Sequence, residues 1–393
     1  MFTLATARSP ERRIPGVPTM TTAQTEFTFE ELLLSHDYAE PLVANSVTCH
    51  GGFDAAGHYL SPRTRFRGPA IEAWEQQRVE QFGTAILDIP LESWPESFPN
   101  VEQSKFLIRN GVTEPTISTL TRIGTVEGFG GMLRLIPIPD FRSLFVEDVR
   151  GTAVDHIARG LFEAHARDEA GHEDEAGHNV MWFIARDIAF ENPVTEDQTA
   201  LMLERMGISP PGAGSSSAAR TRSILEADRV LPADIDPMVE FLLARMIGLL
   251  FIEISAFHGF RWAEAVLSDT DLVAGEGEPA RLVSYIRTDE TPHVSYLRTA
   301  LSEMRDRTWI GTSGARYDGA EMMDLAWNRA VEESLLLRRS EALKVAMREI
   351  EYALKGRSDA KDLVDEMLSL GDVRRLDDGT LVDSADPRFE DAA

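Results

Sequence analysis

The segment Asp289-Glu290-Thr291-Pro292-His293 places a carboxylate and an imidazole at a spacing that suits metal ligands on a helix. At 3.6 residues per turn, Glu290 and His293 lie about 60° apart, so both side chains can reach one point. The apolar residues around them fall on the same side, where a carboxylate and an imidazole are costly to bury without a partner. A bound metal ion is one such partner, whereas a surface Glu and His on a tolerant helix is the simpler interpretation.

A second carboxylate lies in the most apolar helix that the sequence predicts, over residues 237–267. On a helical projection, apolar residues from Val239 to Phe260 fall within about 40° of Glu253, so this carboxylate points into a core. Lone buried carboxylates are rare because ionised groups need partners, and a structural salt bridge is the alternative interpretation. In an antiparallel hairpin with the helix expected over 280–306, Glu253 and Glu290 would lie at similar heights, about 22 and 17 Å from the turn.

The stretch 152–191 predicts one long helix, which begins after Gly151 and stops before Pro193. It contains two Glu-x-x-His pairs, Glu169 with His172 and Glu175 with His178. If the helix is unbroken, its phase turns Glu169 and His172 inward, with His165 one turn earlier as an extra ligand or a supporting group. Glu175 and His178 are the alternative pair, which a bulge between the two glycines of this stretch would turn inward.

One more carboxylate is expected from the helix predicted over 115–135, and Glu127 is the preferred residue. Its glycines weaken that helix, so Glu163 and Glu147 are alternatives. Residues 49–62 are typical of a turn-rich or hairpin segment. Cys49, His50 and His58 in this segment form a weaker metal-site hypothesis, against a packed loop as the simpler interpretation.

Taken in order, the pattern is Glu, Glu-x-x-His, Glu, Glu-x-x-His on four helices within about residues 115–306. It resembles the ferritin-like di-iron carboxylate superfamily, in which such residues bind two metal ions inside a four-helix bundle. The resemblance implies one iron bound by Glu127, Glu169 and His172, and another bound by Glu253, Glu290 and His293, with Glu169 and Glu290 bridging. The additional imidazole of His165 is similar to that of the para-aminobenzoate N-oxygenase group, although there the extra histidine lies elsewhere in the pattern.

The resemblance also implies a di-iron oxidoreductase of the oxygenase or oxidase type. Its cofactors would be two Fe ions, or Fe and Mn, with O2 as co-substrate. It would oxidise a small organic substrate by hydroxylation, desaturation or N-oxygenation, with a reductase or ferredoxin as electron donor, and we expect a homodimer. A ribonucleotide reductase small subunit is an alternative, but Tyr285 and Tyr296 are expected to point about 120–140° away from Glu290. The sequence also allows a ferritin-like iron-binding protein or a metal-free helical interaction protein.

Composition limits the classes of function. The formal net charge of the 393 residues is −26, which argues against a nucleic-acid or anionic-membrane surface. The single cysteine excludes an intramolecular disulfide framework and a cysteine-rich metal site. No apolar run approaches the roughly 20 residues of a transmembrane helix, and we expect a cytoplasmic protein.

The predicted fold class is all-α, a ferritin-like four-helix bundle with additional N- and C-terminal helices. Residues 1–25 are expected to be a disordered segment, in which Met20 is a second candidate start. The remaining expected parts are a helix and loop segment (26–110), the di-metal bundle (111–308) with a mobile connection (194–236), C-terminal helices (309–372) and an acidic disordered tail (373–393).

Overall fold

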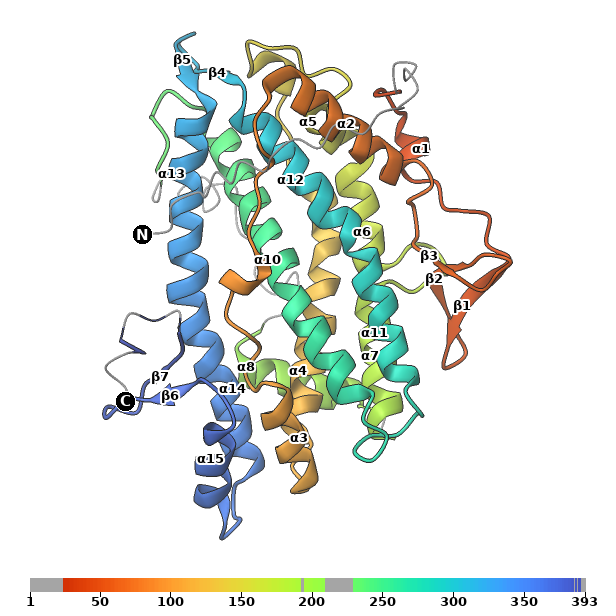
Figure 1. The fold of residues 1–393 in the computed structure, drawn as a ribbon, viewed down its shortest axis with the longest axis vertical. Coiled ribbons are helices and arrows are strands. Elements are labelled where there is room, and N and C mark those ends of the chain that lie inside the picture. Colours follow the sequence, from red (N-terminus) through yellow and green to blue (C-terminus); the bar gives the residue numbers. More distant parts are fainter. Residues whose placement is uncertain (1–23, 192–193, 209–228, 385, 387, 390–393) are drawn as a thin grey trace, which may run out of the picture.

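The computed structural model describes residues 24–191, 194–208, 229–384, 386 and 388–389 (Figure 1). It is mostly helical, with 59% helix and 8% strand, which agrees with the predicted all-α class. Most of the segment expected to be disordered at the N-terminus, and residues 209–228 of the expected mobile connection, lie outside the described residues. No helix in the described ranges is both long and apolar enough to cross a membrane.

Helices dominate each part of the described chain, with short strands between them. The N-terminal part contains α1 (Phe29–Leu32), β1 (Glu40–Ala44), β2 (Val47–Phe53), β3 (Tyr59–Leu60), α2 (Arg67–Phe82), η1 (Leu91–Ser93) and α3 (Val101–Arg109). The central part contains α4 (Glu114–Phe129), η2 (Gly130–Leu135), η3 (Phe141–Ser143), α5 (Ala153–His156), η4 (Ile157–Leu161), α6 (Phe162–Ala170), α7 (His178–Phe190), α8 (Glu196–Met206), α10 (Pro237–Leu267), α11 (Glu278–Asp289) and α12 (Thr291–Arg305). The C-terminal part contains β4 (Thr308–Ile310), β5 (Arg316–Asp318), α13 (Gly319–Val331), η5 (Glu332–Arg338), α14 (Arg339–Ala353), α15 (Ala360–Ser369), β6 (Arg374–Arg375) and β7 (Leu381–Val382).

The long central helices run side by side through the middle of the molecule (Figure 1). Helix α4 packs against α6 and α7, α7 packs against α11, and α10 packs against both α11 and α12. Their facing sides form the main hydrophobic cores. Helices α13 and α14 run along the outside of this arrangement, and α13 packs against α10 and α12.

Helix α10 begins and ends where the sequence predicts, at residues 237 and 267. The Asp236 side chain caps it by accepting a hydrogen bond from Met238 N at 2.8 Å, and Pro237 occupies the first helical position, where its missing N–H costs nothing. Its apolar side chains fill the core between α11, α12 and α13, and Glu253 lies buried near its middle.

The expected unbroken helix over 152–191 is wrong. The chain instead forms α5, the π-helical turn η4, α6, a tight loop over 171–177, and then α7. Gly171 has φ +80°, in the left-handed region that favours glycine. A Cβ atom at Gly177 would collide with the backbone of Gly171, Asp168 and Glu169, so the two glycines permit this close loop. The two Glu-x-x-His pairs therefore do not lie on one continuous helix.

The expected helix over 280–306 is divided at Glu290 into α11 and α12. Pro292 lies in the first turn of α12 and has no N–H to continue the hydrogen-bond ladder of α11, which agrees with the kink that a proline at this position predicts. Glu290 thus lies at the junction of two helices.

Small antiparallel sheets lie within two of the segments that the sequence predicts. Strands β1, β2 and β3 form an antiparallel sheet, which agrees with the hairpin expected within 49–62. The loop over 171–177 docks on this sheet: Ala176 N donates to Thr48 O, and His50 N donates to Ala176 O, each at 3.0 Å. In the expected disordered tail, β6 and β7 pair and bury Leu381 and Val382, so the described part of that tail is ordered. The segment is acidic overall, but burial of this apolar pair explains why it forms strands where disorder is expected.

Candidate metal centre

Carboxylates and imidazoles from distant parts of the chain meet between the central helices. In the part of the chain that the structure describes, they form three groups of metal-ligand atoms, and within each group the atoms lie within 4.8 Å of one another. One group consists of His50, His178 and Asp289, and the other two share Glu169. Of these two, one contains Glu127, Glu169, His178 and Glu290, and the other contains His165, Glu169, Glu253 and His293. Glu169 belongs to both groups, and Glu290 also reaches His293, with 2.6 Å between Oε2 and Nδ1. Glu169 therefore joins these two groups, and Glu290 contacts a residue of each.

Each of the central helices contributes to this centre. Glu127 comes from α4, His165 and Glu169 from α6, His178 from the first residue of α7, Glu253 from α10, Glu290 from the junction of α11 and α12, and His293 from α12. All are buried except Glu127, which is partly exposed. Residues up to 166 positions apart in sequence thus converge, since Glu127 and His293 bound the set.

Several ligand atoms in this centre have no hydrogen-bond partner among the described residues. They are His165 Nε2, both carboxylate oxygens of Glu169, His178 Nδ1 and Glu290 Oε1. Opposite charges lie close, since His178 Nδ1 is 2.8 Å from Glu290 Oε1, but the pair is not aligned as a hydrogen bond. A buried polar group without a partner costs about 1–3 kcal/mol, so converging lone pairs of this kind are suited to a shared cation.

The electrostatics of the carboxylates lead to the same conclusion. Burial, together with the charge of Glu290, raises the pKa of Glu169 well above its ordinary value. Burial and the charge of Glu253 raise the pKa of Glu290 in the same way. Burial alone would raise the pKa of Glu253, but the hydrogen bond and charge of His165 outweigh it and lower that pKa to about 2. Without added positive charge these carboxylates therefore cannot all ionise at neutral pH, and two divalent ions would balance the charge of four carboxylates.

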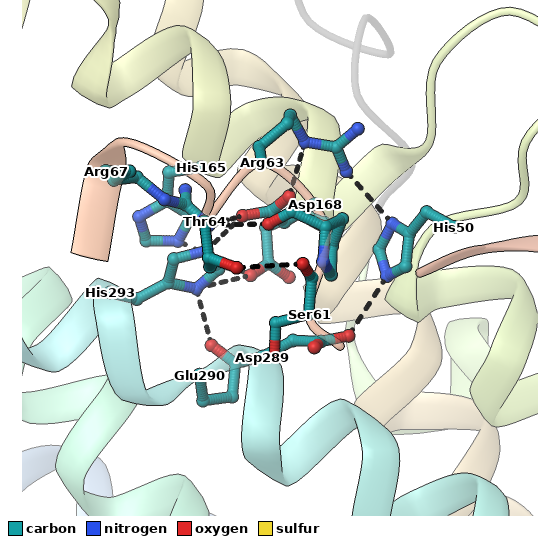
Figure 2. Close-up of polar contacts among 12 residues, drawn as sticks. His50, Ser61, Arg63, Thr64, Arg67, His165, Asp168, Asp289, Glu290 and His293 are labelled. Carbon is teal, nitrogen blue, oxygen red and sulfur yellow. Dashed lines mark hydrogen bonds and ion pairs between the residues drawn. The ribbon is translucent and has the colours of Figure 1, made fainter. Parts of the chain in front are cut away.

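The imidazoles of His178 and His293 are each held between a glutamate and an aspartate. The Nδ1 atoms of both face Glu169 and Glu290. The Nε2 atom of His293 lies 2.9 Å from Asp168 Oδ2 (Figure 2), and the Nε2 atom of His178 lies 3.5 Å from an oxygen of Asp289. Each aspartate immediately precedes a ligand glutamate, and Asp168 orients His293 through a hydrogen bond, whereas the Nε2 atom of His178 has a charge contact with Asp289 but no hydrogen-bond partner among the described residues.

Two arginines from the N-terminal segment bind Asp168. Arg63 Nε and Arg67 Nη2 each donate to one of its carboxylate oxygens at 2.6 Å (Figure 2). Burial alone would raise the pKa of Asp168, but these guanidinium groups hold it well below its usual range. Asp168 therefore stays ionised and can accept the N–H of His293, which leaves the Nδ1 lone pair of that ring directed at the ligand cluster.

Asp289 has a different set of partners, from the small sheet. Tyr59 Oη donates to its Oδ2 at 2.8 Å, and His50 Nε2 lies 3.4 Å from the same oxygen. His50 Nδ1 in turn faces Arg63 at 3.1 Å (Figure 2). The hydrogen bonds between β2 and the loop over 171–177 thus place His50 beside His178, and the rings of the two histidines lie edge to face with centroids 4.9 Å apart.

The structure corrects the expected position of His172. This residue lies in the loop over 171–177, its side chain is 35% exposed, and its nearest charged partner is Glu173 at 3.7 Å. His178 occupies the position expected for His172, paired with Glu169 and not with the exposed Glu175. Helical phase misplaces His172 because the rotation of 100° per residue does not hold across a segment that is not helical.

The weaker hypotheses are also corrected. Cys49, His50 and His58 do not share a site: His50 is buried beside Asp289, whereas the His58 side chain is 78% exposed and pairs with Asp54. The alternatives to Glu127 lie elsewhere, since Glu163 pairs with Arg167 and Glu147 binds the backbone and side chain of Thr308.

Tyr296 lies closer to the centre than the sequence suggests. Its hydroxyl is 2.9 Å from Nδ1 of His165, and both side chains are buried. The expected angle refers to Glu290 on one unbroken helix, whereas the contact is made by His165, which comes from α6. Tyr285 instead stacks on Tyr59, with ring centroids 4.5 Å apart.

A cavity of about 720 Å³ reaches the ligand cluster. Helices α4 and α10 provide much of its wall, and the buried His165, Glu169 and Glu253 are part of its lining. Phe129, Leu133, Leu249 and Phe260 are among its apolar lining residues. This volume is in the range of small-molecule sites, so a substrate could lie directly beside the ligand cluster.

The residues that surround the ligands were not predicted from the sequence. The repeated Asp-Glu dipeptide could have indicated Asp168 and Asp289, because each precedes a glutamate of a predicted ligand pair. Arg63 and Arg67 gave no such signal, since only the tertiary fold brings them to Asp168.

Comparison of the chain with protein-family models, with curated proteins and with solved structures gave no match. The geometry and chemistry of the centre are therefore the basis on which a function can be inferred.

Proposed function

We propose that this protein is an O2-dependent oxidase or oxygenase whose centre holds two Fe ions, or Fe and Mn. The single observation that carries the proposal is the pair of buried ligand groups that share Glu169, with lone pairs that nothing else in the described chain satisfies. Carboxylate and imidazole donors suit iron and manganese, and no thiolate is present in either group.

In this proposal Glu127, Glu169, His178 and Glu290 hold one ion, and His165, Glu169, Glu253 and His293 hold the other. Two reduced ions held there would supply the electrons for the reduction of O2 beside a bound substrate. The order of the ligands along the helices supports a relationship to the ferritin-like di-iron proteins, with His178 in place of His172. An external electron donor and a homodimer belong to the same proposal.

The protein supplies the rest of the chemistry. Asp168 fixes the ring of His293, and Asp289 lies beside the ring of His178, so the Nδ1 atoms of both rings face Glu169 and Glu290. Hydrophobic residues around the cavity limit the access of water, which favours the oxidation of a bound molecule over the loss of electrons to solvent. The proposed reaction type is hydroxylation, desaturation or N-oxygenation of a small organic molecule.

The test is anaerobic loading with Fe(II), removal of unbound metal, and exposure to O2 in a closed electrode chamber. The proposal predicts rapid O2 uptake in proportion to bound iron, and loss of both bound iron and uptake in Glu169→Ala, which removes the shared ligand. A protein that binds two ions but consumes no O2 would contradict the enzymatic function and leave only metal binding.

A ribonucleotide-reductase-like function is a second candidate, because Tyr296 lies 2.9 Å from the His165 ring in the interior of the protein. A stable tyrosyl radical after O2 exposure, seen by electron paramagnetic resonance and absent in Tyr296→Phe, would favour it. Large shells seen by light scattering would instead favour iron storage, and a protein without metal would favour an interaction function.

A further inference from the structure

The cavity beside the ligand cluster contains a cationic group that lacks a counterion. Arg122 lines it from α4, is partly buried, and forms no ion pair or hydrogen bond with the described residues. Burial, together with the charge of Arg339, lowers the pKa of this guanidinium. A buried charge without a partner is unfavourable, and the chain as a whole has a net charge of −26, so an unpaired arginine at this place is unexpected.

The other charged residues of the cavity do not supply that counterion. The carboxylates in its lining are Glu127, Glu169 and Glu253, which all belong to the ligand groups. Arg339 also lines the cavity, but its guanidinium already binds Asp383 at 2.6 Å. Arg338 pairs with Glu333 at 2.6 Å, and Arg245 is exposed and lies over the ring of Phe241. Among the arginines of this lining, Arg122 is therefore the one that is partly buried without an ion pair to the described residues, and it is suited to a single negative charge.

The remainder of the wall is suited to an apolar body. Trp182, Leu249 and Phe260 line the cavity between the helices, and the exposed apolar side chains of Met132 and Ile252 lie along its lining. Apolar side chains that line a cavity are typical of a ligand site. An occupant would thus have a substantial hydrocarbon or aromatic part that contacts these residues.

The position of Arg122 relative to the metal-ligand residues determines how a bound molecule would be oriented in the cavity. It precedes Glu127 by five residues on the same helix, a rise of about 7.5 Å along the helix axis. A negative group bound by Arg122 would thus lie away from Glu127, and the hydrocarbon part could extend toward the buried His165 and Glu169 of the lining.

We propose that the substrate is a carboxylic acid with an apolar body, anchored by Arg122 and oxidised at a position several carbon atoms from the carboxylate. The guanidinium donates paired N–H groups to the carboxylate oxygens, the geometry in which arginine binds carboxylates best. This inference rests on the proposed function for the oxidation step, whereas the binding step depends only on the cavity.

The test is titration calorimetry on the full-length chain after removal of metal with a chelator, so that a carboxylate cannot bind to the ions themselves. The probes are decanoate and 4-phenylbutyrate, each compared with the alcohol of the same carbon skeleton. We expect both acids to bind at one site per chain, and each to bind more tightly than its alcohol.

Arg122→Gln should weaken the binding of the acids by about 10- to 100-fold and leave that of the alcohols nearly unchanged. Arg122→Lys, which keeps the charge, should restore part of the lost affinity. Arg261→Gln is the matched control, because Arg261 is an exposed arginine of α10 that does not line the cavity. Far-ultraviolet circular dichroism verifies that each variant is folded.

Equal binding of acid and alcohol, equal loss in the Arg122 and Arg261 variants, or no binding of either acid would overturn the inference. These results are independent of the proposed function. If the protein consumes O2 but fails this test, the proposed activity stands and the proposed substrate class is wrong. If the acids bind in an Arg122-dependent way but no O2 is consumed, the binding site stands and the proposed activity is wrong.

Discussion

The sequence predicts His172 as a metal ligand, whereas the structure places His178 in the ligand cluster, so these two histidines, six positions apart, can be compared directly. His178 is completely buried, and its Nδ1 atom lies 2.8 Å from Glu290 Oε1 and 3.4 Å from Glu169 Oε1. The His172 side chain is 35% exposed and lies in a loop. We predict that His178→Ala removes a metal ligand and that His172→Ala does not.

The expected size of the effect follows from the two ligand groups. Of the two groups that share Glu169, His178 belongs to the one formed with Glu127, Glu169 and Glu290, and the other keeps all four of its residues. Bound metal should therefore fall from about two ions per chain to about one in His178→Ala. The affinity of the weakened position should fall by more than the roughly 10- to 100-fold that is typical of groups behind the ligands. His172→Ala should keep about two ions per chain.

The assay is anaerobic loading with Fe(II), removal of free metal, and elemental analysis by mass spectrometry, with protein concentration from amino-acid analysis. Circular dichroism before loading shows whether each variant is folded. Full metal content in His178→Ala together with a loss in His172→Ala would refute the reasoning. That result would require the loop over 171–177 to give way to a continuous helix, as the sequence alone suggested.

Three further predictions test the surroundings of the centre. Gly130→Ala should lose bound metal, because the added Cβ would collide with the Cβ and Cγ atoms of Glu169, whereas Gly128→Ala, whose Cβ meets only ordinary contacts, should keep it; elemental analysis compares the two. Asp168→Asn should lower the free energy of unfolding in urea by about 3–5 kcal/mol, because two buried arginines lose their charged partner, and an unchanged value would contradict the role of this ion pair. Burial raises the pKa of Glu303 to about 7 from 4.5, so its ionisation favours the unfolded chain: the stability present below pH 4.5 is lost as the pH rises to about 7. Glu303→Gln cannot ionise, so its free energy of unfolding relative to the unmodified protein should rise by about 3 kcal/mol across that interval, and a constant difference from pH 4.5 to 8 would disprove the effect.

The sequence was most informative where a single helix sets the geometry. The bounds of α10 and the inward position of Glu253 follow from its capping residues and apolar face, which are local features. The spacing of Glu290 and His293 survives the break at Pro292, because both residues lie within one turn of the junction. Local periodicity therefore predicted these three residues of the centre.

The sequence was least informative where backbone breaks and distant segments decide the geometry. The loop over 171–177 depends on close backbone packing at Gly171 and Gly177, and helical phase cannot be carried across it. The positions of His50 and Arg63 depend on how the small sheet docks against that loop, which is a tertiary contact with no periodic pattern in the sequence. These residues could be assigned only from the fold.

The central claim is that two metal ions bind in the positions defined by the shared Glu169. Anomalous diffraction from crystals grown with Fe(II) or Mn(II), collected on either side of the metal absorption edge, tests it most directly. We expect two peaks per chain, one among Glu127, Glu169, His178 and Glu290, and one among His165, Glu169, Glu253 and His293. No peak among these residues, or peaks only at exposed acidic groups elsewhere on the protein, would contradict the account.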